Sequence, residues 1–263
     1  MRPNPVKSRL REGGSTIGTW LSLASPLAAR FLARTAFDWL TVDVEHSPVD
    51  WETAAVMFGH VAEAGGVPLV RVPAGKHDHI KRALDSGAFG VVVPMVMDRD
   101  EAKRCVAACR YPPVGTRSVG GSLHALNFDA SPAEYFSRAN DEILVVLQCE
   151  HIDAVRQADE IFSVPGIDAI FVGPNDLRAS MRSADGDDPS SEAFEAALEA
   201  IRLACDRHGV APGLHVFSVE SARERLDQGW RFIALGSDLS LMLEAAETST
   251  AALGKIGRKA ANY

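Results

Sequence analysis

Four ionisable residues stand at the ends of short apolar segments in this sequence and could together support metal-assisted carbonyl chemistry. Glu150 and Asp176 follow two such segments, His46 follows a third, and Arg71 lies at the end of a fourth. Two carboxylates without a thiolate suit a hard cation such as Mg²⁺ or Mn²⁺, which keeps several waters or exchanges two of them for substrate oxygens. A neutral imidazole can act as a general base, and a guanidinium can stabilise a developing oxyanion.

Each of these residues also has a structural interpretation. Either carboxylate alone is readily explained as a helix cap or as an arginine partner, and only the pair favours a metal site. A lone histidine is more often structural, but His46 follows an acidic segment beside the predicted metal site. Arg71 could pair with Asp43 or Glu45 instead of binding substrate, and the spacing leaves both roles open.

Three further residues near these segment ends, His151, His215 and Ser237, are interpreted as supporting or structural rather than catalytic. Ser237 is expected to cap the last helix or to present backbone N–H groups to an anion. No lysine ends an apolar segment, and no G-x-S-x-G motif occurs. A Schiff-base aldolase and a serine hydrolase are therefore disfavoured, and carbonyl chemistry would need a metal as its electron sink.

The segments that position these residues alternate between two kinds. Short, nearly all-apolar runs typical of buried parallel strands occur at Ile17–Leu21, Trp39–Val42, Pro68–Val72, Gly90–Val93, Ile143–Cys149, Ala169–Val172, Pro212–Val216 and Phe232–Leu235. Helical periodicity predicts helices at Asp50–Ala64, His77–Ser86, Asp98–Arg110, His151–Phe162, Ser191–His208, Val219–Gln228 and Asp238–Leu253. Asp50, Asp98 and Asp238 are expected to cap three of them.

Strict alternation of strands and helices predicts one α/β domain over residues 1–263 with the architecture of a (β/α)8 barrel. A doubly wound open sheet is the alternative, but no predicted strand is followed by G-x-G-x-x-G. The C-terminal ends of barrel strands form one mouth, so the ionisable residues are predicted to meet there. The long irregular stretch Tyr111–Asn127, followed by a short helix at Pro132–Ala139, is expected to be functional or to lie at an interface.

The composition restricts the partners. A net charge of −8 repels phosphate backbones and anionic lipids, so neither nucleic acid nor membrane is an expected partner. The N-terminal segment lacks the apolar stretch of a signal peptide, and the longest apolar runs are too short to span a bilayer. A cytoplasmic protein is therefore expected. The four cysteines form no C-x-x-C pair, and Cys105 and Cys109 are predicted to share a core-facing stripe.

Several blocks of the sequence together resemble the metal-dependent pyruvate aldolases of the 4-hydroxy-2-oxoheptanedioate aldolase (HpcH/HpaI aldolase/citrate lyase) family. The blocks follow the family's order across most of the chain, which makes them far more specific than any single motif. They are F-D-W-L-T-V-D-V-E-H at Phe37–His46, V-R-V at Val70–Val72, V-V-P-M-V at Val92–Val96, R-Y-P-P-V-G-T-R-S-V-G-G at Arg110–Gly121, the segment Gln148–Glu150, F-V-G-P-N-D-L at Phe171–Leu177 and A-L-G-S-D at Ala234–Asp238.

The resemblance implies a barrel of the phosphoenolpyruvate/pyruvate-binding type that holds a divalent cation, Mg²⁺, Mn²⁺ or Co²⁺, through Glu150 and Asp176. The 2-oxo acid would chelate this cation through its carboxylate and keto oxygens. His46 would act as the base and Arg71 as the stabiliser of the oxyanion. The residues that would line the pyruvate pocket are Gln148, Pro174, Asn175 and Arg71.

The resemblance also implies an aspartate that raises the basicity of the catalytic histidine, and Asp85 matches it by position. The predicted helix places Asp85 on the opposite side of the barrel from His46. Either a neighbouring subunit delivers it, or the predicted boundaries are displaced, or Asp43 takes this role. Family members are typically hexamers in which C-terminal helices, here 238–253, swap between paired chains, so a homohexamer is expected.

Four residues around the mouth depart from the family's usual pattern, namely His151, Arg178, Arg182 and His215. These departures leave the identity of the aldehyde half of the substrate more open than that of the pyruvate half. The leading hypothesis is reversible cleavage of a 4-hydroxy-2-oxo acid to pyruvate, or a close 2-oxo acid, and an aldehyde. The alternatives are a metal-dependent oxaloacetate decarboxylase and a non-catalytic 2-oxo-acid-binding barrel. The sequence leaves the natural aldehyde, the metal and the direction of flux open.

Overall fold

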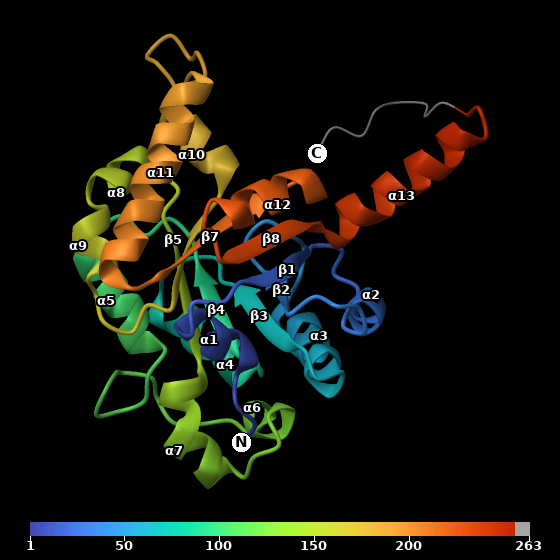
Figure 1. Cartoon of the computed structure of the whole chain (residues 1–263). Helices are drawn as coiled ribbons and strands as arrows, with labels where there is room; N and C mark the ends of the chain where they lie inside the picture. Colours follow the sequence, from blue (N-terminus) through green and yellow to red (C-terminus); the bar gives the residue numbers. More distant parts are fainter. Residues whose placement is uncertain (256–263) are drawn as a thin grey trace.

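The computed structural model describes residues 1–255, so residues 256–263 of the expected domain lie outside the described part. Its centre is a closed barrel of eight parallel strands in the order β1 to β8, completed by pairing of β1 with β8 (Figure 1). The strands are β1 (Thr16–Leu21), β2 (Trp39–Asp43), β3 (Val67–Arg71), β4 (Gly90–Val93), β5 (Leu144–Gln148), β6 (Ala169–Val172), β7 (Ala211–Val216) and β8 (Phe232–Ser237). Each coincides closely with one predicted apolar run, so the predicted (β/α)8 barrel is confirmed.

Helices surround the barrel (Figure 1). They are α1 (Pro5–Arg11), α2 (Pro26–Leu32), α3 (Trp51–Glu63), α4 (His77–Asp85), α5 (Arg99–Ala108), α6 (Leu123–Asn127), α7 (Pro132–Glu142), α8 (Ile152–Arg156), α9 (Ala158–Phe162), α10 (Pro174–Ser180), α11 (Ser191–His208), α12 (Val219–Asp227) and α13 (Asp238–Ala252). Across residues 1–255, none of them is long and apolar enough to cross a membrane.

Two helix predictions differ from the structure. The single helix predicted over His151–Phe162 is wrong: α8 and α9 meet at Gln157, whose φ of −106° and ψ of 14° interrupt the helical backbone. The short helices α1, α2, α6 and α10 were not predicted. Three of these, α1, α2 and α10, carry proline in their first turn, where its missing N–H costs nothing, although the same prolines read as loop signals in the sequence.

Side-chain caps start most of the helices that follow the strands, with α4 and α10 as exceptions. Asp50 and Asp98 cap α3 and α5 as predicted. Ser237 caps α13 through a capping box: its hydroxyl accepts a hydrogen bond from the backbone N–H of Ser240, and the Ser240 hydroxyl accepts one from the backbone N–H of Ser237. The prediction that Asp238 caps this helix is wrong, because its carboxylate accepts hydrogen bonds from the backbone and hydroxyl of Ser22. Asp238 therefore ties the end of β1 to the start of α13.

The barrel wall is closely packed where β1, β2 and β8 meet. The indole of Trp39 stacks on the ring of Phe232 with 4.2 Å between centroids. A Cβ built on Gly18 would lie only 2.0 Å from the Trp39 ring, so this position needs glycine. Cys105 and Cys109 are both buried, which confirms their predicted core-facing stripe.

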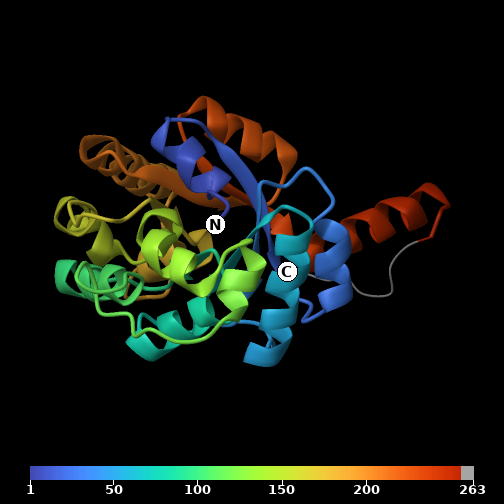
Figure 2. The ribbon, with the colours of Figure 1, turned by 90° about the horizontal axis from the view of Figure 1, so that it is seen from below.

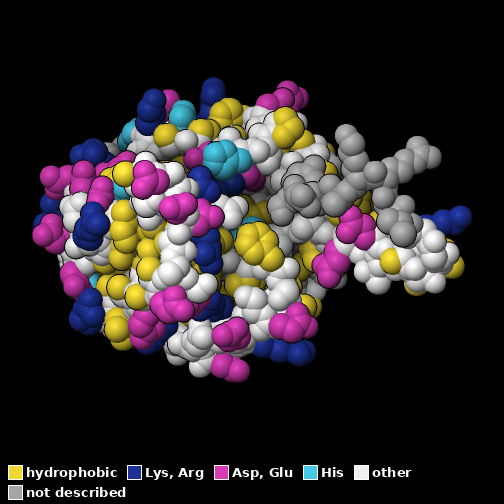
Figure 3. All heavy atoms as spheres, turned by 90° about the horizontal axis from the view of Figure 1, so that it is seen from above, with side chains coloured by type: hydrophobic (Ala, Val, Ile, Leu, Met, Phe, Trp, Pro, Cys, Tyr) yellow, Lys and Arg dark blue, Asp and Glu magenta, His cyan; other side chains and the backbone are white. Residues whose placement is uncertain are grey.

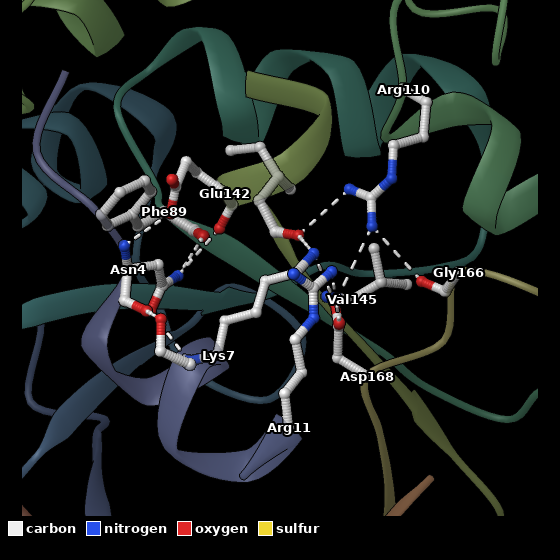
Figure 4. A network of polar contacts seen from close by, with 11 residues as sticks. Asn4, Lys7, Arg11, Phe89, Arg110, Glu142, Val145, Gly166 and Asp168 are labelled. Atoms are coloured by element: carbon white, nitrogen blue, oxygen red, sulfur yellow. Dashed lines mark hydrogen bonds and ion pairs between the residues drawn. The ribbon is translucent and has the colours of Figure 1, made fainter. Parts of the chain in front are cut away.

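The end of the barrel opposite the mouth is closed by α1 and α7 (Figure 2). Lys7 of α1, only 2% exposed, donates a 2.6 Å hydrogen bond to the Ile143 carbonyl and lies 3.0 Å from the Asp168 carboxylate (Figure 4). Arg110 approaches the same carboxylate at 3.8 Å. Burial lowers the pKa of Lys7 to about 8, although the charge of Asp168 opposes this shift. Asp168 is therefore the anion that makes a buried lysine tolerable.

Replacing Asp168 with alanine is expected to lower the free energy of unfolding by about 3–5 kcal/mol, because it leaves the buried ammonium of Lys7 without its anion. Chemical denaturation followed by circular dichroism measures this loss. Asp159→Ala is the matched control, since its exposed pair with Arg207 is worth at most about 1 kcal/mol. Equal losses in the two variants would contradict the role given to Asp168.

Candidate active site

The ionisable residues that follow β2, β3, β5 and β6 lie at one end of the barrel, because all strands run in the same direction. These residues are His46, Arg71, Glu150 and Asp176. Figure 3 views the molecule from above, onto this end, and shows acidic, basic and histidine side chains beside hydrophobic ones. The chemistry predicted from the sequence therefore depends on how these side chains are arranged around the mouth.

Glu150 is buried beside the end of β5, with 2% exposure. One carboxylate oxygen, Oε2, accepts a 2.6 Å hydrogen bond from Gln148 Nε2, and the other, Oε1, accepts a 3.0 Å bond from the backbone N–H of Met95. Met95 has a φ of 52°, a left-handed conformation that a side-chain-bearing residue rarely adopts. Burial raises the pKa of Glu150 to about 7; the Met95 N–H opposes this, and the charge of Asp176 adds to it.

Gly173 lies against both predicted metal ligands. A Cβ built on Gly173 would lie 2.3 Å from Glu150 Oε2 and 3.6 Å from Asp176 Oδ2. Asp176 is exposed in the first turn of α10, whereas Glu150 is buried. Two carboxylate oxygens beside the same backbone position, one of them desolvated, form a donor set that fits a hard divalent cation.

The carboxylate pair would leave most positions around such a cation to water or substrate. Within residues 1–255, no group of three or more His, Cys, Asp or Glu side chains is arranged to hold a metal ion. Two protein ligands are the number expected where a cation keeps several waters and binds through substrate oxygens. The donor set is therefore that of an open site rather than of a closed structural one.

Arg71 ends β3 and forms the ion pairs that the sequence left open. Its Nε and Nη2 donate hydrogen bonds of 2.9 and 2.6 Å to the two oxygens of Asp43, and Nε lies 3.3 Å from Glu45. The guanidinium also lies 4.6 Å above the Trp20 ring. Burial would lower the pKa of Arg71, but the bonds and charge of Asp43 raise it above its ordinary value. These contacts leave Nη1 without a hydrogen-bond partner among residues 1–255.

Asp43 organises the loop after β2. Besides Arg71, its carboxylate accepts bonds from the backbone N–H groups of Glu45 and His46, at 3.1 and 3.2 Å, and from the Ser47 hydroxyl at 3.3 Å. Burial would raise the pKa of Asp43, but the Arg71 bonds and charge, with those N–H groups, hold it below its ordinary value. Asp43 thus contacts the backbone of His46 and not its imidazole.

The imidazole of His46 is 64% exposed and lies 3.8 Å from Glu45. Burial raises the pKa of Glu45, and the charges of Arg71 and His46 oppose this rise. Glu45 therefore lies within 4 Å of both the predicted base and the predicted oxyanion stabiliser, although Asp43 is closer to Arg71. The sequence placed it only as an alternative partner of Arg71.

A cavity of about 390 Å³ opens beside these residues. It is lined by Trp20, Ser22, Asp43, His46, Arg71, His215 and Ser237, together with Ser47, Pro48 and Leu239. The mouth therefore has a cavity that holds the predicted base and arginine, and Glu150 and Asp176 are not among its lining residues.

Three of the four predicted pyruvate-lining residues, Gln148, Pro174 and Asn175, occupy the side of the mouth formed by β5 and β6, whereas Arg71 lines the cavity. Gln148 is buried, and its Oε1 has no hydrogen-bond partner in the described part of the chain. Pro174 and Asn175 form the first residues of α10 next to Gly173. These residues surround the carboxylate pair rather than the cavity that holds His46.

The structure does not bring Asp85 to the mouth of its own chain. Asp85 ends α4, at the end of the barrel where α6 and α7 lie (Figure 1). Its carboxylate accepts a 2.7 Å hydrogen bond from Arg117, and its carbonyl lies 3.4 Å from Nδ1 of His124 in α6. The predicted boundaries of this helix hold, so displaced boundaries do not explain its distance from His46.

The remaining predicted residues have structural contacts. His151 caps α8 through Nδ1. The guanidinium of Arg178 lies 3.7 Å above the Phe194 ring, and Arg182 pairs with Asp188. None of these side chains lines the cavity.

Three residues of the mouth escaped the sequence prediction: Trp20, Met95 and Gly173. Glu45 was predicted as a possible partner of Arg71, but its proximity to His46 was not. Trp20 reads as an ordinary core residue, and the roles of Met95 and Gly173 depend on backbone geometry.

A closed barrel whose mouth carries a carboxylate pair, an arginine and an exposed histidine defines a (β/α)8 enzyme. The sequence model of the HpcH/HpaI aldolase/citrate lyase family matches residues 16–245. The chain is 38% identical over 248 residues to a hydroxypyruvate/pyruvate aldolase of Paraburkholderia phytofirmans, which covers 92% of this chain and 94% of the relative. It is 36% identical over 252 residues to a 4-hydroxy-2-oxo-heptane-1,7-dioate aldolase of Escherichia coli, with 95% of each chain covered.

A solved structure agrees with these sequence relatives. A HpcH/HpaI aldolase/citrate lyase family protein from Burkholderia cenocepacia superposes with a TM-score of 0.88 at 34% identity, covering 96% of this chain and 100% of that one. The chain therefore belongs to the HpcH/HpaI aldolase/citrate lyase family and is a carbon–carbon lyase.

Proposed function

We propose that this lyase reversibly cleaves a 4-hydroxy-2-oxo acid to pyruvate, or a close 2-oxo acid, and an aldehyde, with a divalent cation as cofactor. The observation that carries the proposal is the buried Glu150 carboxylate, which lies beside Gly173 together with the carboxylate of Asp176. The relatives named above are aldolases, which supports the same reaction class. Mg²⁺, Mn²⁺ and Co²⁺ are the candidate cations.

In this mechanism Glu150 and Asp176 would hold the cation, which would supply Lewis-acid polarisation of the 2-oxo group. In the cleavage direction, His46 removes the C4 hydroxyl proton, directly or through a water, while the C3–C4 bond breaks. The free Nη1 of Arg71 donates to the oxygen on which negative charge develops. Asp43 holds the guanidinium in place through its two hydrogen bonds.

Replacing His46 with alanine is expected to lower kcat for aldol cleavage by about 10²–10⁴-fold, the usual contribution of general-base catalysis. Decarboxylation of oxaloacetate, which needs the enolate but no base for a hydroxyl proton, is expected to be largely spared. Steady-state assays of the two reactions on the same preparation give the comparison. His60→Ala, on α3, serves as a control histidine. Equal losses of both activities would refute the role of His46 as base.

Oxaloacetate decarboxylation is the second candidate function. The exposed imidazole of His46, whose nearest charged partner is Glu45 at 3.8 Å, favours it, because this reaction does not need a fixed base. A wild-type enzyme that decarboxylates oxaloacetate rapidly but condenses pyruvate with no aldehyde would establish this candidate instead.

We further propose that the enzyme is a homohexamer with C-terminal helices exchanged between paired chains. Of the residues of α13, only Asp238 is buried, and the helix projects away from the barrel (Figure 1). Met242 of this helix and Leu253, its C-cap residue, are 53% and 78% exposed, which supports coverage by another chain. Asp85 lies opposite the mouth of its own chain, so it could reach His46 only from a neighbouring subunit.

A further inference from the structure

The cavity that holds His46 contains two polar groups that the proposed aldol chemistry does not use. Nε2 of His215 and Nε1 of Trp20 are buried and have no hydrogen-bond partner in the described part of the chain. Both residues line the cavity. Because buried polar groups are nearly always hydrogen-bonded, two unpartnered nitrogens in one cavity indicate a missing partner.

The other polar side chains of this cavity already have partners. Ser22 donates its hydroxyl to Asp238, and Ser237 accepts from the Ser240 backbone. Asp43 is occupied by Arg71 and by the loop after β2. His215 and Trp20 therefore remain as the polar groups free to recognise a ligand, beside the base and the arginine.

His215 is held as a neutral ring. Its imidazole lies between the rings of Trp20 and Phe217, with centroids 6.2 and 4.7 Å away. Burial, followed by the positive charge of Arg71, lowers the pKa of His215 to about 4. A neutral imidazole presents one acceptor and one donor, whereas the indole Nε1–H of Trp20 is a donor only.

The partner of these groups belongs to the aldehyde half of the substrate. The cavity is lined by His46, the proposed base on the C4 oxygen, and at one side by Arg71, the proposed oxyanion stabiliser, whereas Glu150, Asp176 and Gln148 are not among its lining residues. A hydroxyl both donates and accepts, so it complements an imidazole acceptor beside an indole donor. A methyl or methylene group in the same place would leave both nitrogens unpartnered.

We propose that His215, with Trp20, is a specificity-determining residue that selects aldehydes bearing a hydroxyl on the carbon next to the carbonyl. The inference rests on the proposed aldolase function. It assigns a substrate class, the small 2-hydroxyaldehydes, to the cavity that holds His46 and Arg71.

Glycolaldehyde and propanal are suitable probes, because they have the same number of heavy atoms and differ by a hydroxyl in place of a methyl. With pyruvate as donor, C3 of pyruvate bonds to the aldehyde carbon, the C3 proton is released to a base, and the new alkoxide takes up a proton. The wild-type kcat/KM is expected to favour glycolaldehyde by about tenfold or more. His215→Leu is expected to lower the glycolaldehyde value about tenfold and to leave the propanal value within about threefold.

Two further variants separate recognition from damage to the site. His215→Gln, which keeps a donor and an acceptor, is expected to restore most of the preference for glycolaldehyde. Trp20→Phe keeps the ring without the Nε1–H and is expected to lower the same preference about threefold. Deuterium exchange at the pyruvate methyl group, which needs no aldehyde, is expected to be unchanged in His215→Leu.

The outcomes are distinguishable. An unchanged aldehyde preference in His215→Leu overturns the inference. The inference is also overturned if His215→Leu loses only the proton exchange at C3 of hydroxypyruvate and keeps the exchange at C3 of 2-oxobutanoate. The recognised hydroxyl would then belong to the donor and not to the aldehyde. Absence of pyruvate exchange in the wild-type protein instead overturns the proposed function itself.

Discussion

Replacement of Glu150 with glutamine is expected to lower the metal-dependent exchange of pyruvate methyl protons for deuterium by about 10³-fold or more. Glutamine keeps the shape of the side chain and can still accept the Met95 N–H bond, but it lacks the charge that binds a hard cation. NMR in D₂O at fixed Mn²⁺ or Mg²⁺ measures the exchange, and calorimetric titration of the same cation measures its affinity.

Asp176→Asn is expected to lower the metal affinity in the same direction, because it removes the second carboxylate beside Gly173. Glu160→Gln, an exposed change on the nearby α9, is the matched control and is expected to leave exchange unchanged. Full exchange and unchanged cation affinity in Glu150→Gln would contradict the metal site.

Replacement of Arg71 with alanine is expected to lower kcat for aldol cleavage by about 10²–10³-fold, the usual cost of losing one donor to a developing oxyanion. The change also leaves Asp43 without its two-bond partner, so the pKa of that carboxyl is expected to rise. Arg71→Lys keeps a charge but not the planar fork, and it is expected to recover only part of kcat.

Circular dichroism of each Arg71 variant separates lost chemistry from lost folding. Arg156→Ala removes an exposed arginine of α8 and is expected to leave kcat within about twofold. If Arg71→Ala is folded and retains full kcat, the ion pair with Asp43 is the whole role of this residue.

The barrel could be predicted from the sequence because each strand is a contiguous apolar run and each connection contains a local helical pattern. The closed topology then brings the C-terminal ends of the strands together, so Glu150, Asp176, His46 and Arg71 could be placed at one mouth before any geometry was known. The helix break at Gln157 could not be predicted, because helical periodicity continues across it.

Side-chain direction and backbone strain account for what the sequence left undecided. Spacing places Arg71 near Asp43, but only the structure shows two parallel hydrogen bonds between them. The φ of 52° at Met95 has no signature in a non-glycine residue. Likewise, His215 reads as a lone histidine until Trp20, from a strand far away in the sequence, is seen beside it.

The most direct test of the central claim is deuterium exchange at the methyl group of pyruvate by the wild-type protein, with Mg²⁺, Mn²⁺ or Co²⁺ and after removal of metal by a chelator. No aldehyde is needed, so the measurement isolates enolate formation. A metal-dependent pyruvate aldolase exchanges these protons only when the cation is present. Pyruvate binding without exchange under any of these metals would contradict the claim and identify a 2-oxo-acid-binding barrel.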